Sequence, residues 1–152
     1  MNNNELLNKW LGIPKLLVER SDFLGEDKLH LVVVSTLPVA SCPDCGRVSN
    51  PVHDESEAQM IRDLRIAERQ GYLVYRARRF KCEHCQKTFV ERVEGKRPNV
   101  SYTERYERYV YQRVRRETVS QVAQDEGLSE EATQAIFEHR AKKRWRHAAT
   151  RA

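Results

Sequence analysis

Cys42-Pro-Asp-Cys45-Gly46 and Cys82-Glu-His-Cys85-Gln86 are two C-x-x-C segments that contain all four cysteines of this 152-residue chain. Two residues between the cysteines of a tight turn let both sulfurs point at one ion. Two such turns complete the tetrahedral coordination that Zn²⁺ takes in closed structural sites. Four thiolates leave no position open for water, so the expected zinc stabilises the fold rather than taking part in a reaction. The sequence therefore predicts a four-cysteine zinc ribbon, with more residues between the pairs than the usual stretch of about 15–20.

Disulfide and redox roles are the alternatives for these cysteines. Disulfides need an oxidising compartment, and the N-terminal Met-Asn-Asn-Asn-Glu-Leu-Leu does not resemble a secretory signal. A redox C-x-x-C needs only one pair, in a thioredoxin-like βαβ context that this sequence lacks. His84 lies inside the second pair, but four thiolates already suffice as ligands. It is therefore expected to be solvated, as are His30 and His53.

Charge is distributed unevenly along the chain. The net charge is +5, and residues 1–60 contain 5 Lys/Arg and 9 Asp/Glu, a balance of −4. Residues 61–152 contain 22 and 13, a balance of +9. A basic half joined to an acidic half is the asymmetry expected when one part meets nucleic acid. The longest apolar run, Leu31 to Val34, is far shorter than a membrane span.

The order of predicted elements gives an α+β fold, in which a four-cysteine zinc ribbon with β-hairpins precedes a three-helix helix-turn-helix domain. A helix is expected over residues 4–12, a hairpin over residues 16–36, and a strand over residues 72–80 with its partner over residues 88–93. Residues 46–61 are expected to be an irregular loop. The predicted domains are residues 1–94 for the N-terminal helix, hairpin and ribbon, 95–101 for a basic linker, 102–147 for the helix-turn-helix domain, and 148–152 for a tail.

A helical apolar period begins after the linker. The first helix is expected to run from Ser101 or Thr103 to about Arg116, and the second to cover Val119 to Glu126. Gly127 can take a left-handed turn at no steric cost, and Ser129 caps a third helix that ends near Arg146. This placement is typical of a helix-turn-helix, which presents its last helix to the DNA major groove.

Candidate DNA contacts fall in two groups. Near the second cysteine pair and in the linker, basic side chains could reach phosphates or enter a minor groove. On the last helix, the early polar residues could read bases, whereas five cations within residues 140–146 suit phosphates. An ordinary solvated surface remains the alternative for each group. The candidates are Arg76, Arg78, Arg79, Lys96, Arg97, Ser129, Glu131, Thr133, Gln134, His139, Arg140, Lys142, Lys143 and Arg144.

The combination of these motifs resembles the N-terminal region of ISL-three family insertion-sequence transposases. The resemblance covers about residues 5–145 and rests on both cysteine pairs, on Ile61-Arg62-Asp63-Leu64, on the Arg-Arg-Phe-Lys approach to Cys82, on Phe89-Val-Glu-Arg92, and on the helix-turn-helix. His53 also belongs to the pattern. The resemblance implies binding to terminal inverted repeats, and it assigns catalysis to a following RNase H-like domain, which this sequence lacks.

These observations predict a zinc-stabilised, sequence-specific duplex DNA-binding protein rather than an enzyme. The expected sites are terminal inverted repeats or related DNA, and the expected location is the nucleoid in a bacterial cytoplasm. A homodimer and a transposase partner are both compatible with this interpretation. The alternatives are a standalone transcriptional regulator or transposition inhibitor, a zinc-ribbon protein-interaction adaptor, and an RNA-binding ribbon. An adaptor would show little salt-dependent DNA affinity, and an RNA-binding ribbon would prefer RNA to duplex DNA in competition.

Overall fold

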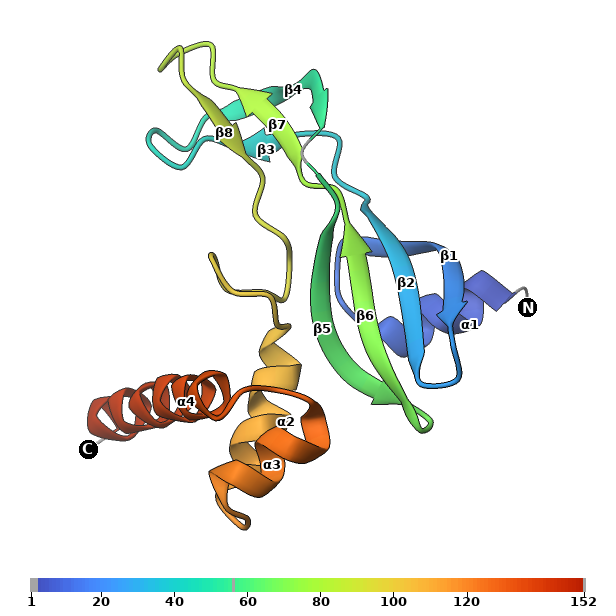
Figure 1. Cartoon of the computed structure of the whole chain (residues 1–152). Helices are drawn as coiled ribbons and strands as arrows, with labels where there is room; N and C mark the ends of the chain where they lie inside the picture. Colours follow the sequence, from blue (N-terminus) through green and yellow to red (C-terminus); the bar gives the residue numbers. More distant parts are fainter. Residues whose placement is uncertain (1–2, 56, 152) are drawn as a thin grey trace. The chain divides into compact units, whose positions relative to one another are not determined.

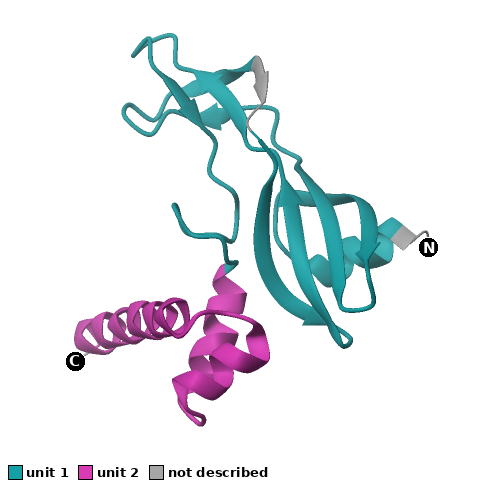
Figure 2. Cartoon of the chain, viewed as in Figure 1, with its two compact units in different colours: residues 1–103 teal, residues 104–152 magenta. Residues whose placement is uncertain are grey.

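The computed structural model of the chain describes residues 3–55 and 57–151, apart from the side chains of residues 3 and 53–55. Two compact units divide the chain, residues 1–103 and residues 104–152 (Figure 2). The described residues form four helices and two four-stranded sheets, which confirms the predicted mixed α+β class. No helix in the described part of the chain combines the length and the apolar character that crossing a membrane requires.

The first sheet has the strand order β1-β2-β6-β5 (Figure 1). Strands β1 (Leu16–Leu24) and β2 (Lys28–Ser35) form the predicted antiparallel hairpin. Strand β2 runs parallel to β6 (Arg69–Tyr75), and β6 pairs antiparallel with β5 (Gln59–Ile66).

One face of this sheet forms the core of the first unit. Leu29, Leu31 and Val33 alternate along β2 with more exposed residues, as the two-residue period of a strand requires. Helix α1 (Asn3–Leu11) lies against β1 and contributes the buried Leu11. The burial of this face holds β2 and β6 in place, and the chain passes from these two strands into the second sheet.

The second sheet has the order β3-β4-β7-β8 and carries both cysteine pairs. Its strands are β3 (Ala40–Ser41), β4 (Val48–Glu55), β7 (Arg78–Lys81) and β8 (Thr88–Val90). The first cysteine pair lies between β3 and β4, and the second lies between β7 and β8. Strands β4 and β7 pair antiparallel at the centre of the sheet, and this pairing brings together two turns that are distant in sequence.

Two strand predictions were wrong. Residues 46–61, expected to be irregular, contain β4 and the start of β5. Pro51 argues against a strand in the sequence because proline has no backbone N–H to donate to a sheet. In the structure Pro51 pairs with Phe80 next to a register irregularity, where proline is tolerated. The single strand expected over residues 72–80 is instead β6 and β7, which belong to different sheets. The continuous apolar and basic alternation did not mark the break between them.

The second unit consists of α2 (Glu104–Val114), α3 (Val119–Glu126) and α4 (Glu130–Thr150). The Thr118 hydroxyl oxygen accepts from Gln121 N at the start of α3, and the Ser129 oxygen accepts from Ala132 N at the start of α4. Gly127 adopts φ 66°, the left-handed conformation predicted for it, at the end of α3. Helix α4 continues four residues beyond the predicted end at Arg146.

Candidate metal centre and nucleic-acid interface

The two cysteine turns have the same backbone structure. In the first, Cys42 N donates to Arg47 O at 2.8 Å and Gly46 N donates to Cys42 O at 2.8 Å. In the second, Cys82 N donates to Lys87 O and Gln86 N donates to Cys82 O, at 2.9 and 2.8 Å. Gly46 and Gln86 both have positive φ, at 75° and 57°. Each turn thus reverses its chain tightly enough for both of its cysteines to face the other turn.

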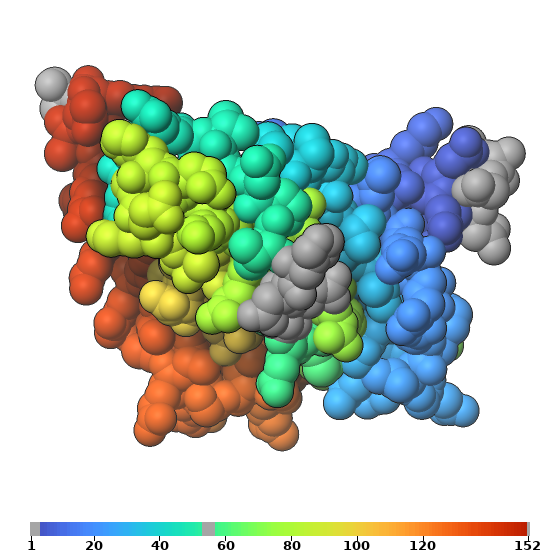
Figure 3. Space-filling model, turned by 90° about the horizontal axis from the view of Figure 1, so that it is seen from above, coloured from blue at the N-terminus to red at the C-terminus, as the bar shows by residue number. Residues whose placement is uncertain are grey.

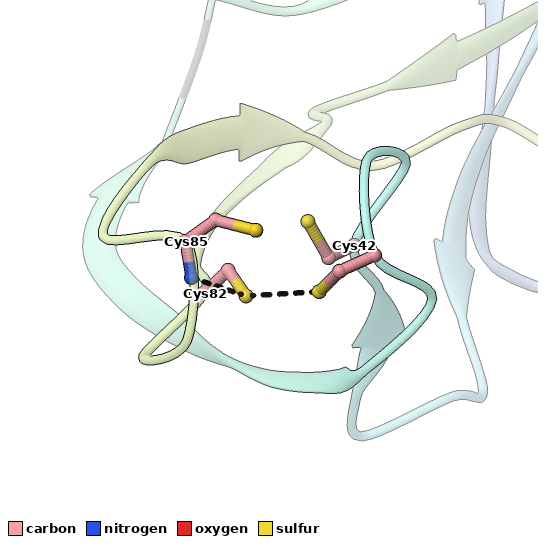
Figure 4. Close-up of side chains that lie close together, drawn as sticks. Cys42, Cys82 and Cys85 are labelled. Atoms are coloured by element: carbon pink, nitrogen blue, oxygen red, sulfur yellow. Dashed lines mark hydrogen bonds between the residues drawn. The ribbon is translucent and has the colours of Figure 1, made fainter.

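These turns bring the four sulfurs of Cys42, Cys45, Cys82 and Cys85 within 4.8 Å of one another. Figure 4 shows the side chains of Cys42, Cys82 and Cys85 directed toward a common centre. A tetrahedral zinc with Zn–S bonds of about 2.3 Å needs sulfurs about 3.8 Å apart, and the sulfurs of Cys45 and Cys82 are 3.6 Å apart. The donor set and its size therefore fit Zn²⁺. Figure 3 shows the two turn segments, coloured teal and yellow-green, next to each other on the surface.

The pKa values of two cysteines in the cluster also bear on cation binding. The backbone N–H of Cys85 donates to Cys82 Sγ at 3.4 Å and lowers the pKa of the Cys82 thiol to about 6, which favours the thiolate that binds metal. A hydrogen bond with the Cys45 thiol, together with burial, raises the pKa of Cys85 to about 12. Metal binding would displace the Cys85 proton, because zinc binds cysteine as the thiolate.

His84 is exposed, as expected of a side chain that is not a ligand. The side chain of His53 lies outside the described residues. His30 is only partly exposed and meets Tyr72 edge-on, with ring centroids 5.3 Å apart. Burial lowers its pKa, so the prediction that His30 is solvated was wrong.

The Arg78 side chain is bound to other residues of the same unit. Its guanidinium forms an ion pair with Glu91 at 2.9 Å and donates to Leu37 O at 2.6 Å. Tyr75 also donates to Glu91. Burial alone would raise the pKa of the Glu91 carboxyl, but the hydrogen bonds from Arg78 and Tyr75 outweigh burial and lower it. The structure thus gives Arg78, a candidate DNA contact, an internal partner, whereas its neighbours Arg76 and Arg79 are exposed.

The candidate residues of the linker and of the start of α4 have different exposures. Lys96 and Arg97 are half-buried, and Lys96 Nζ donates to Arg97 O at 3.0 Å. Ser129, Glu131 and Gln134 are exposed. Thr133 is fully buried and its hydroxyl donates to Ser129 O at 2.9 Å. Thr133 is therefore a packing residue, and its prediction as a DNA contact was wrong.

The second half of α4 carries the predicted cations. Lys142, Lys143 and Arg144 are exposed, and His139 and Arg140 are half-buried. Two further arginines that were not predicted, Arg108 on α2 and Arg115 just after it, line the same groove as part of this run. Their helical spacing of seven residues, with Tyr111 and Gln112 between them, is the signal that could have identified a shared face.

The cluster of four cysteine sulfurs on the ribbon and the left-handed glycine turn of the helical unit lie within the segments that two family models match. Residues 38–85 match the family model described as zinc-finger of transposase IS204/IS1001/IS1096/IS1165. Residues 91–141 match the model for the helix-turn-helix domain of transposase family ISL3. Over these segments the chain has the zinc-ribbon and helix-turn-helix domains of ISL3-family transposases, and no catalytic-domain model matches it. No curated protein and no solved structure matches the chain.

Proposed function

We propose that this chain binds duplex DNA in a sequence-specific manner at the ends of a mobile element, with one structural zinc held by Cys42, Cys45, Cys82 and Cys85. The observation that carries the proposal is the succession of two ISL3 transposase domains, the first of which gathers four sulfurs into a site of zinc size. A closed thiolate site would hold the β4–β7 end of the ribbon together and leave recognition to protein side chains.

The helical unit supports the DNA-binding part of the proposal. The turn at Gly127 positions α4 after α3, and Val122, Ala123 and Ile136 are buried at this corner. In a three-helix arrangement of this type, α4 would enter the major groove and present Gln134 and Glu131 near base edges. Transposon ends occur in pairs, so the proposal includes a second copy of the chain or a transposase as the protein partner. DNA binding would place the protein at the nucleoid of a bacterial cytoplasm.

The basic run of α4 provides a test that does not require the site sequence. Replacing Lys142, Lys143 and Arg144 together with alanine is expected to weaken binding to every duplex alike. Each phosphate contact contributes about 0.9 to the slope of log affinity against log salt, so the loss of three contacts should make the slope shallower by roughly 2.7. Fluorescence anisotropy with the zinc-loaded full chain at several salt concentrations would measure this change.

A matched control for this variant is the triple replacement of Arg20, Lys28 and Arg47, three cations of the first half of the chain, with alanine. Its slope should stay close to that of the unsubstituted chain. Equal salt slopes for the unsubstituted chain, the α4 variant and the control variant would show that Lys142, Lys143 and Arg144 do not contact DNA. Absence of salt-dependent duplex binding by the unsubstituted protein would contradict the proposed function and favour an adaptor role.

A further inference from the structure

A basic groove lies between α2 and α4 in the second unit. Its volume is about 470 Å³, and its lining residues follow the spacing i, i+3, i+4 and i+7 on each side. One set begins on α2 and ends just after it, and the other lies on α4. The lining residues are Arg108, Tyr111 and Gln112 from α2, Arg115 just after α2, and Arg140, Lys143, Arg144 and His147 from α4.

Few carboxylates lie close to the cations of this groove. In the described part of the chain, no carboxylate lies within 4.0 Å of Arg108, Arg115, Arg140 or Arg144, and Lys143 is 4.0 Å from Glu104. Arg113, on another face of α2, forms ion pairs with Glu117, Asp125 and Glu126. Arg113 thus serves internal structure, whereas Arg108 on α2 and Arg115 just after it have no carboxylate within 4.0 Å among the described residues.

The floor of the groove is held by aromatic contacts. The rings of Tyr111 and Phe137 stack at 5.2 Å between centroids, with an angle of 23° between their planes. The Arg115 guanidinium lies 5.9 Å from the centre of the Tyr111 ring, and Arg115 Nη1 donates to Gln112 Oε1 at 3.4 Å. These contacts hold a cation at the rim without neutralising it, as a preorganised anion site requires.

Acidic residues on α4 are confined to its first half. Glu130, Glu131 and Glu138 precede the groove residues, and no Asp or Glu follows Glu138 in the sequence. The Gln134 amide donates to Glu138 at 3.0 Å. The start of α4 is thus poorly suited to close contact with phosphates, whereas the half that borders α2 is suited to them.

We propose that the groove between α2 and α4 binds consecutive phosphates of one strand of a DNA duplex, so that α2 supplies backbone contacts of its own. The proposal rests on the proposed DNA-binding function and names the surface that anchors it. A stripe from i to i+7 is about 10 Å long, whereas successive phosphates rise about 3.4 Å along the duplex, so the groove is long enough for at least two. Guanidinium groups suit phosphate because they donate in a planar fork.

The test compares two double variants of the zinc-loaded full chain. Arg108→Gln with Arg115→Gln removes two groove cations, one on α2 and one just after it. Lys9→Gln with Lys28→Gln removes the same charge from exposed positions of the first unit, and neither residue lines the groove or is a candidate DNA contact. Duplex affinity is measured at several salt concentrations, and thermal melting verifies that both variants remain folded.

The groove variant is expected to lose roughly 10–60-fold in duplex affinity at 0.1 M salt and one to two units of salt slope. The control variant is expected to remain close to the unsubstituted chain. If both variants lose equally, or neither loses, the groove is not the phosphate site, although DNA binding itself stands. If the unsubstituted chain binds no duplex, the proposed function fails as well.

A second probe distinguishes DNA from an acidic protein partner. Polyglutamate presents closely spaced carboxylates without the duplex geometry. The proposal predicts that the groove variant loses much more affinity for duplex DNA than for polyglutamate. Loss of polyglutamate binding with an unchanged DNA slope would overturn the proposal and identify the groove as a site for acidic polypeptides.

Discussion

Replacing Cys82 with serine is expected to abolish stoichiometric zinc binding and to unfold the ribbon. Cys82 is buried, and its sulfur lies 3.6 Å from Cys45 Sγ at the meeting point of the two turns. Structural zinc sites in zinc-finger peptides contribute about 10–16 kcal/mol of apparent binding free energy, which is also folding free energy. The second unit contains no cysteine, so its helices should persist. Metal analysis and circular dichroism of the purified protein would measure both effects.

The matched control for this substitution is His84→Asn in the same turn. His84 is exposed and not needed for a four-thiolate site, so the variant should keep about one zinc per chain and an unchanged melting temperature. Zinc retained by the Cys82→Ser variant together with zinc lost by the His84→Asn variant would assign the ligands differently. Zinc retained by both, with unchanged melting, would contradict a closed four-cysteine site.

Glu126→Ala is expected to destabilise the helical unit by about 3–5 kcal/mol, the range observed when one partner of a buried charged network is removed. The Glu126 side chain is fully buried. It accepts hydrogen bonds from Tyr106 OH at 2.9 Å, Tyr109 OH at 2.8 Å and Arg113 Nη1 at 3.3 Å. Its loss would leave two phenols and a guanidinium without this shared acceptor. Urea unfolding followed by the helical circular dichroism signal would measure the change.

Glu117→Ala provides the comparison because Glu117 also pairs with Arg113 but its side chain is 36% exposed. Water can replace this interaction, so the expected loss of stability is much smaller than for Glu126→Ala. Near-equal unfolding free energies for the two variants would show that α2 and α3 do not depend on the buried carboxylate. The Glu126 network would then be a minor contributor to the stability of the unit.

The most local signals in the sequence were the most reliable. The cysteine spacing predicted two matching turns, and the structure brings their sulfurs together. Ser129 and Gly127 marked the ends of helices because capping and left-handed backbone depend on only a few neighbouring residues. The hairpin of β1 and β2 was equally clear because its apolar alternation repeats over several residues.

Features that depend on distant residues were not predicted. Strand β4 contains Pro51 and is stabilised by pairing with β7, so its own residues gave little strand signal. The parallel pairing of β2 with β6 joins segments that are far apart in the sequence. In the helical unit, Arg108 and Arg115 became functional candidates only when α4 was placed beside α2. Conversely, Thr133 looked like a surface residue until packing buried it.

The central claim is that a zinc-loaded chain recognises particular duplex sequences. The most direct measurement is selection of bound duplexes from a pool that combines random and genomic DNA, with a parallel selection after metal removal. We expect the zinc-loaded protein to enrich one motif that matches the terminal repeats of a mobile element, and we expect this enrichment to disappear without metal. Enrichment of promoter sites would instead favour a transcriptional regulator. No enrichment over the input pool by the zinc-loaded protein would contradict sequence-specific DNA binding.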